Sequence, residues 1–279
     1  MSSTTHNMAP ASGVLPAYQQ PQRVTQARVL RAEWTKLRTQ PAVFWTLLSA
    51  VILVIGFGIG YSLLRVARPP HGAAAIASFD ASAISLSGVQ LAQIAVGVLG
   101  VLLITSEYAT GLIRTTFAAV PRRLPVLWGK AALVTVAVAA VSLPATFAAF
   151  LAGQSILSHQ HLAVPLNHPG VVRAVIGSGL YLAAIGLLGL GLGGIVRNAA
   201  GGVAALFGVL YGLPLAAALL PDTLAADVTK YLPATAGQAV TTVQPDPTLL
   251  QPWTGFGVLC MYAAVLIGLA AVRLRRGDA

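Results

Sequence analysis

Apolar residues form six long runs along the chain, and polar or charged residues gather between them. The runs cover residues 42–64, 84–105, 125–152, 171–196, 199–220 and 253–272. A helix crosses the hydrocarbon core of a bilayer with about 20 mostly apolar residues, so each run is long enough for one crossing. The pattern predicts an all-α polytopic membrane protein, with six transmembrane helices in a domain that covers residues 41–273.

A shorter amphipathic pattern precedes the first run. In "VTQARVLRAEWTKLRT", Ala27, Leu30, Trp34 and Leu37 share one helical face, while the arginines fall elsewhere on the wheel. This pattern is typical of a helix that lies in the membrane interface with its apolar face in lipid. We therefore expect an N-terminal interfacial amphipathic helix over residues 24–40 that binds membrane lipids; a solvated basic tail is the alternative.

Three other segments are too polar or too short to cross. Residues 1–23 are rich in Ser, Thr, Pro and Gln and are expected to form a disordered tail. Residues 274–279 form a second tail. The outer segment, residues 221–252, contains "YLPATAGQAV", which is too apolar for a free loop, so a packed or re-entrant helix is expected there.

The composition supports the membrane assignment, and the charges give an orientation. Hydrophobic residues make up 56% of the chain and charged residues 9%, whereas soluble domains carry about 25% charged residues. If both termini are cytoplasmic, the inner side holds thirteen basic and three acidic residues, a net +10, and the outer side holds four of each. Basic residues favour the cytoplasmic side, so we expect a membrane protein with both termini in the cytoplasm.

Several chemistries find little support in the sequence. The single cysteine, Cys260, permits no intrachain disulfide, and we expect no metal site and no cofactor. "LWGKA" lacks the first glycine and the Ser/Thr of a phosphate-binding loop, so the chain is not expected to be an ATPase or another enzyme. The six runs contain no acidic residue, so an ion-driven carrier is not indicated. The loop histidines His159, His161 and His168 leave a lipid-modifying membrane enzyme as an alternative.

A few residues within the runs are candidates for a substrate path. Gln90 and Gln93 lie three apart on one helical face, where they either contact a substrate or bond to another helix. Pro144 and Pro214 each remove a backbone donor and are expected to kink their helices, with the fifth run the one more readily broken. Glycines also recur four residues apart, which favours close helix packing; these pairs are Gly56 and Gly60, Gly189 and Gly193, and Gly208 and Gly212.

The segment "SEYATGLIRTTFAAVPRR", residues 106–123, is unusually patterned for a connecting loop. Thr105 or Ser106 is expected to end the second span, and Glu107 to begin a new helical turn. The residues expected to couple this segment to a soluble ATPase partner are Glu107, Tyr108, Gly111, Leu112, Ile113, Arg114 and Phe117. Such a short amphipathic helix could dock on the partner and pass its motion into the second and third spans.

These motifs resemble a known family. "AEWTKLRT" before the first span, "SEYATGLIRTTFAAVPRR" and the following "GK" are similar to permease subunits of bacterial ATP-binding-cassette exporters of the second permease class, in their six-span actinobacterial form. The resemblance implies two permease chains, identical or sister, with two cytoplasmic ATP-binding subunits. It also implies a coupling helix between the second and third spans, and export of a drug, antibiotic, lipid or similar molecule by alternating access. A non-transporting sensor or regulator of an ATPase is the alternative within the same assembly.

Overall fold

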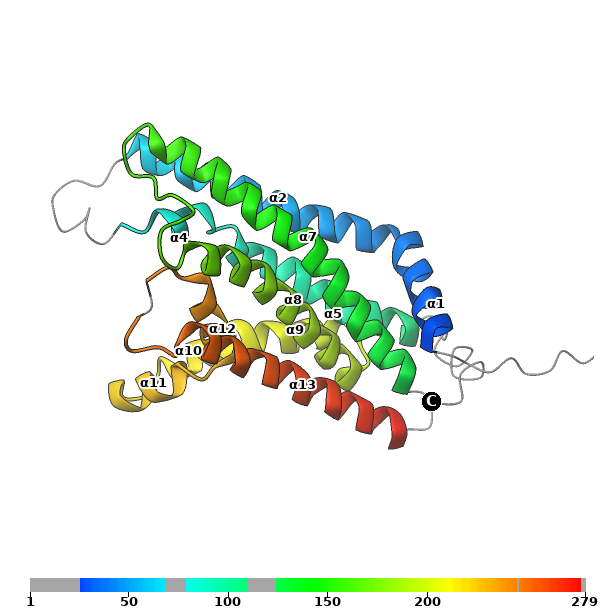
Figure 1. Ribbon diagram of the computed structural model, residues 1–279. Coiled ribbons are helices and arrows are strands. Elements are labelled where there is room, and N and C mark those ends of the chain that lie inside the picture. The colour runs from blue at the N-terminus through cyan, green and yellow to red at the C-terminus, as the bar shows by residue number, and fades with distance from the viewer. Residues whose placement is uncertain (1–25, 69–78, 110–123, 245, 277–279) are drawn as a thin grey trace, which may run out of the picture.

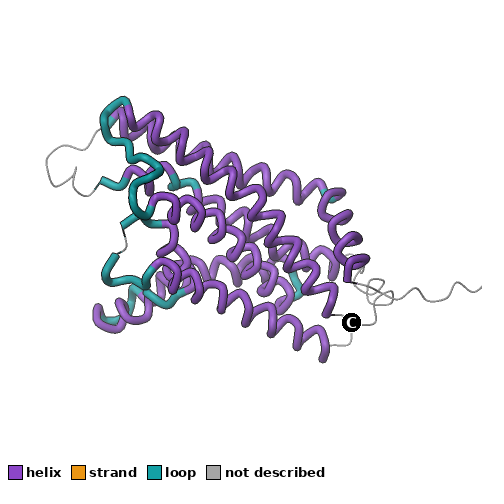
Figure 2. Tube along the Cα trace, viewed as in Figure 1, coloured by secondary structure: helices purple, strands orange, loops and turns teal. Residues whose placement is uncertain are grey.

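The computed structural model describes residues 26–68, 79–109, 124–244 and 246–276, and within these ranges the secondary structure is helical, with no strand. Six of the described helices are long and apolar enough to cross a membrane. The chain is therefore a multi-pass membrane protein, and its all-α fold is confirmed. Figures 1 and 2 show the spans as one elongated bundle.

The spans differ from the predicted runs mainly at their ends. They are α2 (Pro41–Ala67), α5 (Val89–Ala109), α7 (Leu124–Ser158), α8 (Val171–Val196), a fifth span in three parts, and α13 (Pro252–Arg276). The prediction that the second span begins near residue 84 was wrong, because a separate short helix, α4 (Ala81–Ser85), precedes α5. The carboxylate of Asp80 caps α4 by accepting from the backbone N–H groups of Ser82 and Ala83.

The fifth span is interrupted, as Gly212 and Pro214 predicted. It consists of α9 (Ala199–Phe207), a π-helical turn η1 (Gly208–Gly212) and α10 (Leu213–Ala217). Pro214 is the second residue after the π-helical turn, and its missing N–H leaves a gap in the regular hydrogen-bond ladder. Pro144, by contrast, lies inside the uninterrupted helix α7.

Short helices complete the two ends of the bundle. Helix α1 (Gln26–Thr39) lies at the end where α5, α8 and α13 finish and α7 begins, which we call the α1 end (Figure 1). The start of α1 and the end of α13 thus lie at the same end. At the opposite end, the α12 end, the outer segment forms α11 (Asp222–Thr229), α12 (Pro233–Gln238) and a short 3-10 turn, η2 (Ala239–Thr241).

The outer segment is packed rather than free, as expected. Helix α12 buries Pro233, Ala234, Ala236 and Gly237, and it lies against α13. The guanidinium of Arg173, at the start of α8, donates to the carbonyl oxygens of Thr242 and Val243 at 2.9 and 3.0 Å.

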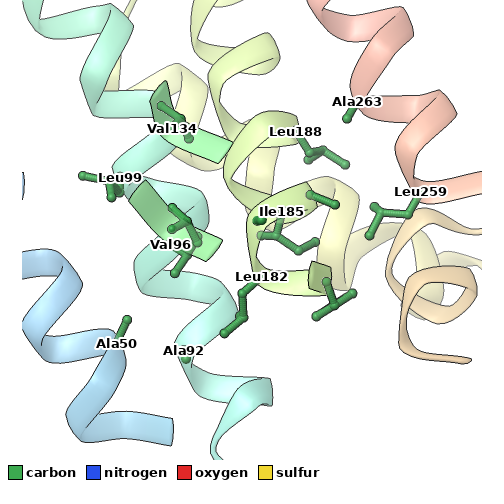
Figure 3. Packing of buried hydrophobic residues seen from close by; sticks show 14 of the residues in the cluster. Ala50, Ala92, Val96, Leu99, Val134, Leu182, Ile185, Leu188, Leu259 and Ala263 are labelled. Carbon is green, nitrogen blue, oxygen red and sulfur yellow. The ribbon is translucent and has the colours of Figure 1, made fainter. Parts of the chain in front are cut away.

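The core is built around α8, the most buried span. Residues from α5, α7, α8 and α13 meet there, and Figure 3 shows Val96, Val134, Ile185 and Leu259 among them. Helices α5 and α8 approach closely because glycines face each other. A Cβ on Gly189 would overlap the carbonyl oxygen of Gly97, and one on Gly100 would overlap that of Gly186.

The surface of the bundle is apolar where a lipid-exposed surface is expected. Only 17% of the fifth span and 22% of α2 is buried within the chain. Large apolar side chains therefore face outward, among them Phe44, Trp45, Ile52, Leu215 and Leu219. Such a surface suits hydrocarbon and would be unstable in water.

Candidate functional site: a charge ring at the α1 end and an amide–phenol cluster at the α12 end

Four charged side chains from three helices form a closed ring at the α1 end, which we call the charge ring: Glu33 and Lys36 on α1, Glu107 on α5 and Lys130 on α7. The Nζ of Lys36 lies 2.7 Å from Glu33 and 2.9 Å from Glu107. The Nζ of Lys130 lies 2.7 Å from Glu33 and 3.2 Å from Glu107. Each acid therefore contacts both lysines, and the charges alternate around the ring.

Three members of the charge ring are buried and one is partly open. The side chains of Glu33, Glu107 and Lys130 are only 5%, 8% and 7% exposed, whereas that of Lys36 is 39% exposed. Removing an ion from water costs several kcal/mol, a cost that close, hydrogen-bonded partners must offset. The ring has two charges of each sign, so the loss of any one of the four leaves it electrically unbalanced.

The charge ring corrects two predictions. Helix α5 continues to Ala109, so Thr105 and Ser106 do not end the span and Glu107 does not begin a separate turn. Glu107 and Lys130 are buried ionisable residues on spanning helices, although the apolar runs indicated no acid within a span. The predicted interfacial helix exists, but its contacts are not only with lipid: Glu33 is buried against the bundle, Leu37 packs against the core, and Trp34 is exposed.

The ring shifts the pKa of its two α1 members in opposite directions. Burial alone would raise the pKa of Glu33, but the charges of Lys130 and Lys36 and their hydrogen bonds lower it below its ordinary 4.5. Burial alone would lower the pKa of Lys36, but hydrogen bonds to Glu33 and Glu107 raise it above its ordinary 10.5.

These shifts predict a broad pH range over which α1 stays attached. A lowered carboxyl pKa stabilises the folded state above 4.5, and this contribution is lost as pH falls through the folded value. A raised lysine pKa stabilises it below 10.5, and this contribution is lost as pH rises through the folded value. In a Cys260→Ala background, the distance between spin labels at Thr35→Cys on α1 and Ala132→Cys on α7 should stay constant from about pH 5 to 10. A change near neutral pH would show that other groups hold α1.

The remaining predicted coupling residues are only partly described. Tyr108 packs against the core at the end of α5, with the guanidinium of Arg197 located 5.3 Å from its ring centroid. Arg197 also donates to the carbonyl oxygen of Arg273 at 2.9 Å, which joins the tight α8–α9 hairpin to α13. Gly111, Leu112, Ile113, Arg114 and Phe117 lie outside the described residues.

The second site is a cluster of amide and phenol groups toward the α12 end. The amide nitrogen of the buried Gln93 donates to Gln90 at 3.2 Å and to the hydroxyl of Tyr211 at 3.0 Å. The hydroxyl of Tyr181 donates to the amide oxygen of Gln93. Gln238 on α12 donates to the exposed Gln90 at 3.1 Å. Hydrogen bonds therefore join α5, α8, η1 and α12, which confirms the interhelical role expected for Gln93.

The structure does not gather the other substrate-path candidates at this cluster. Pro144 lies on the exposed face of α7, and Pro214 is half-buried on α10. A hollow between the spans, lined by residues that include Val54, Val96 and Leu182, offers about 10 Å³, enough for one water at most. None of the four candidates lines this hollow. A substrate-sized path would therefore require helix movement or a second chain.

The three loop histidines are not gathered into a metal or catalytic centre in the part of the chain that the structure describes. His159, His161 and His168 are exposed. Among the described residues, no three His, Cys, Asp or Glu side chains are placed to hold a metal ion.

Comparison of the sequence with known protein-family models and with curated proteins finds no match. Function is therefore inferred from the residues and their arrangement.

Proposed function

We propose that the chain is the permease subunit of an ATP-binding-cassette exporter, and that residues 106–123 are its contact with a cytoplasmic ATPase. The observation that carries this proposal is the position of the segment. It joins the last turn of α5 to the first turn of α7, at the end of the bundle where α1 lies and where the basic residues of the sequence gather. A force applied there is delivered directly to two spans.

The pattern of residues 106–123 and its resemblance to the coupling segment of the exporter family support the same function. The chain has no phosphate-binding loop, so its energy would come from the ATPase partner. Two copies of this chain, or this chain and a sister permease, would form the membrane part of the complex. Little of the fifth span and of α2 is buried within the chain, so both leave apolar surface for a second chain as well as for lipid.

The apolar character of the surface and the interior supports a proposal for the substrate class. The small hollow between the spans is lined almost entirely by apolar side chains, and the outer face of the bundle is apolar. We infer export of a hydrophobic or amphiphilic molecule by alternating access across the bacterial plasma membrane. Gln90 and Gln93 are candidates for contact with its polar group, provided that the interhelical hydrogen bonds of Gln93 open during the cycle.

The proposed orientation gives a direct labelling test. In a Cys260→Ala background, a cysteine at Thr39 on α1 should resist an impermeant thiol reagent in intact cells, because it would be cytoplasmic. A cysteine at the exposed Thr223 on α11 should react. Labelling at position 39, with protection at position 223, would invert the topology and place residues 106–123 on the wrong side for an ATPase.

The coupling contact is tested by Ile113→Asp. A fully buried aliphatic side chain contributes about 1.5–3 kcal/mol, and a carboxylate in an apolar contact adds a desolvation cost. Co-purification of the cognate ATPase should fall by at least about tenfold, since 1.4 kcal/mol corresponds to a factor of ten.

Membrane insertion serves as the control for Ile113→Asp, and Thr223→Asp at the opposite end should leave co-purification unchanged. A variant Ile113→Asp that inserts normally and retains the ATPase with wild-type affinity would mean that residues 106–123 are only a connector.

A further inference from the structure

Helices α5 and α7 make little direct contact with each other, although residues 106–123 connect them. Helix α5 packs most extensively against α8, whereas α7 packs against both α8 and α2. At the α1 end, the charge ring provides a direct link, because Lys130 on α7 contacts Glu107 on α5 at 3.2 Å. The ring is therefore a local bridge between two helices that are otherwise held apart.

Two side chains of helix α1 take part in this bridge. Lys36 reaches Glu107 on α5 at 2.9 Å, and Glu33 reaches Lys130 on α7 at 2.7 Å. The two side chains lie one helical turn apart on α1 and also contact each other at 2.7 Å. The opposite side of α1 presents Trp34 and Arg38 outward, with the guanidinium 5.9 Å from the indole centroid. One face of α1 thus binds the bundle and the other faces its surroundings.

The ring also lies close to both ends of residues 110–123. Glu107 is in the last turn of α5, three residues before that segment, and Lys130 is in the second turn of α7, seven residues after it. The distance between the end of α5 and the start of α7 limits how residues 110–123 can be placed against an ATPase. An element that fixes this distance therefore affects the placement of the segment without contacting the ATPase itself.

We propose that Glu33 and Lys36 are positioning residues for coupling: through the charge ring, α1 clamps the ends of α5 and α7 together, so that a force on residues 106–123 moves α1, α5 and α7 as one unit. The inference rests on the proposed function, because it assigns these residues to the same coupling step. It adds an element, α1, that lies in another part of the sequence.

A purely stabilising role would make a different prediction. Buried ion pairs are poor stabilisers compared with packed apolar residues, and loss of one partner is costly mainly because it leaves a charge unbalanced. In a clamp, each single neutralisation should loosen α1 and reduce coupling. Removing Glu33 and Lys130 together restores charge balance, so a purely stabilising role would recover both. A clamp would recover neither, because Lys130 is the only member of the ring on α7.

The structural half of the test needs no ATPase. In a Cys260→Ala background, double electron–electron resonance measures the distance between spin labels at Thr35→Cys on α1 and Ala132→Cys on α7. We expect one narrow distribution for the otherwise unchanged chain, and broad distributions for Glu33→Gln and for Glu33→Gln/Lys130→Met. Labels at Ala132→Cys and Met261→Cys, both on spans, should keep a narrow distribution in every variant.

The functional half uses the complex with the cognate ATPase of the proposed exporter, in vesicles of phosphatidylethanolamine and phosphatidylglycerol. The measurement is the ATP hydrolysis that the membrane subunit adds to that of the ATPase alone. Glu33→Gln should lower this stimulation by about two- to thirtyfold, the range that coupling residues usually produce, and the double variant should not recover it. Asp227→Asn is the matched control, because it breaks the exposed Lys230–Asp227 pair at the other end and should change nothing.

Loosening of α1 together with lost stimulation, in Glu33→Gln and still in the double variant, supports the proposal. Recovery of both in the double variant would overturn it, since charge balance alone would then account for the ring. Loosening with normal stimulation would overturn it, since α1 would then be attached without serving coupling. Lost stimulation with an unchanged α1 distance would also overturn it, since the ring would act by another route. If the unmodified chain fails to bind or stimulate any ATPase, the proposed function is wrong and the coupling role falls with it, while the resonance measurement still decides whether the ring holds α1.

Discussion

Gly189→Ala should disrupt the bundle more than any other single-methyl change predicted here. The added Cβ would overlap the carbonyl oxygen of Gly97 on α5, which is backbone and cannot rotate away. Helices α5 and α8 would have to separate, and they share the most extensive contact in the bundle. Overpacking typically costs about 1–3 kcal/mol when side chains can adjust, so a backbone clash belongs at or above the upper end. The measurement is thermal unfolding of the purified chain in detergent.

The control for Gly189→Ala is chosen by the space around the glycine. A Cβ on Gly268 of α13 meets no other atom within 4 Å, so Gly268→Ala should be tolerated or slightly stabilising. Gly100→Ala, on the other side of the same helix contact, should behave like Gly189→Ala. Equal melting temperatures for Gly189→Ala and Gly268→Ala would contradict the close α5–α8 packing.

Lys130→Met should be the most destabilising change at the charge ring. It leaves the buried carboxylates of Glu33 and Glu107 with only the partly exposed Lys36 as a partner. Breaking a buried ion pair on one side costs about 3–5 kcal/mol, and the surviving lysine places this case near the lower figure. Thermal unfolding in detergent measures the loss.

Two comparisons separate unbalanced charge from lost packing. Lys230→Met breaks an exposed ion pair, which contributes at most about 1 kcal/mol, so it should have little effect. Glu33→Gln/Lys130→Met should be more stable than Lys130→Met alone, because it restores charge balance. A double variant less stable than both single variants would show that packing rather than charge governs the site.

The sequence predicted the helical framework because its signals are local. An apolar run of sufficient length and a flanking polar segment define a span without knowledge of its neighbours. Helix α1, the interrupted fifth span and the packed outer segment each follow from a short pattern of this kind. The end of α5 was predicted too early, since Ser106 and Glu107 look like a boundary until a buried lysine on another helix is available to the acid.

Contacts between distant segments could not be predicted in the same way. Of the three glycine pairs, Gly189 and Gly193 pack tightly against α5, whereas a Cβ on Gly56, Gly60, Gly208 or Gly212 would meet nothing within the chain. Spacing alone does not say which face meets a neighbour. The charge ring joins residues up to 97 positions apart. A hint existed, since Glu33 and Lys36 lie one turn apart on an amphipathic helix and Glu107 and Lys130 flank one loop.

The most direct measurement of the central claim is a photocrosslink from the proposed coupling segment. A benzophenone amino acid placed at Ile113, in cells that also produce the cognate ATPase, should give an adduct with that ATPase on irradiation. The same amino acid at Thr223, at the α12 end, should give none. An adduct at position 113 alone is the predicted result; no adduct at position 113, or an adduct at position 223, would contradict the proposal that this chain couples to an ATPase through residues 106–123.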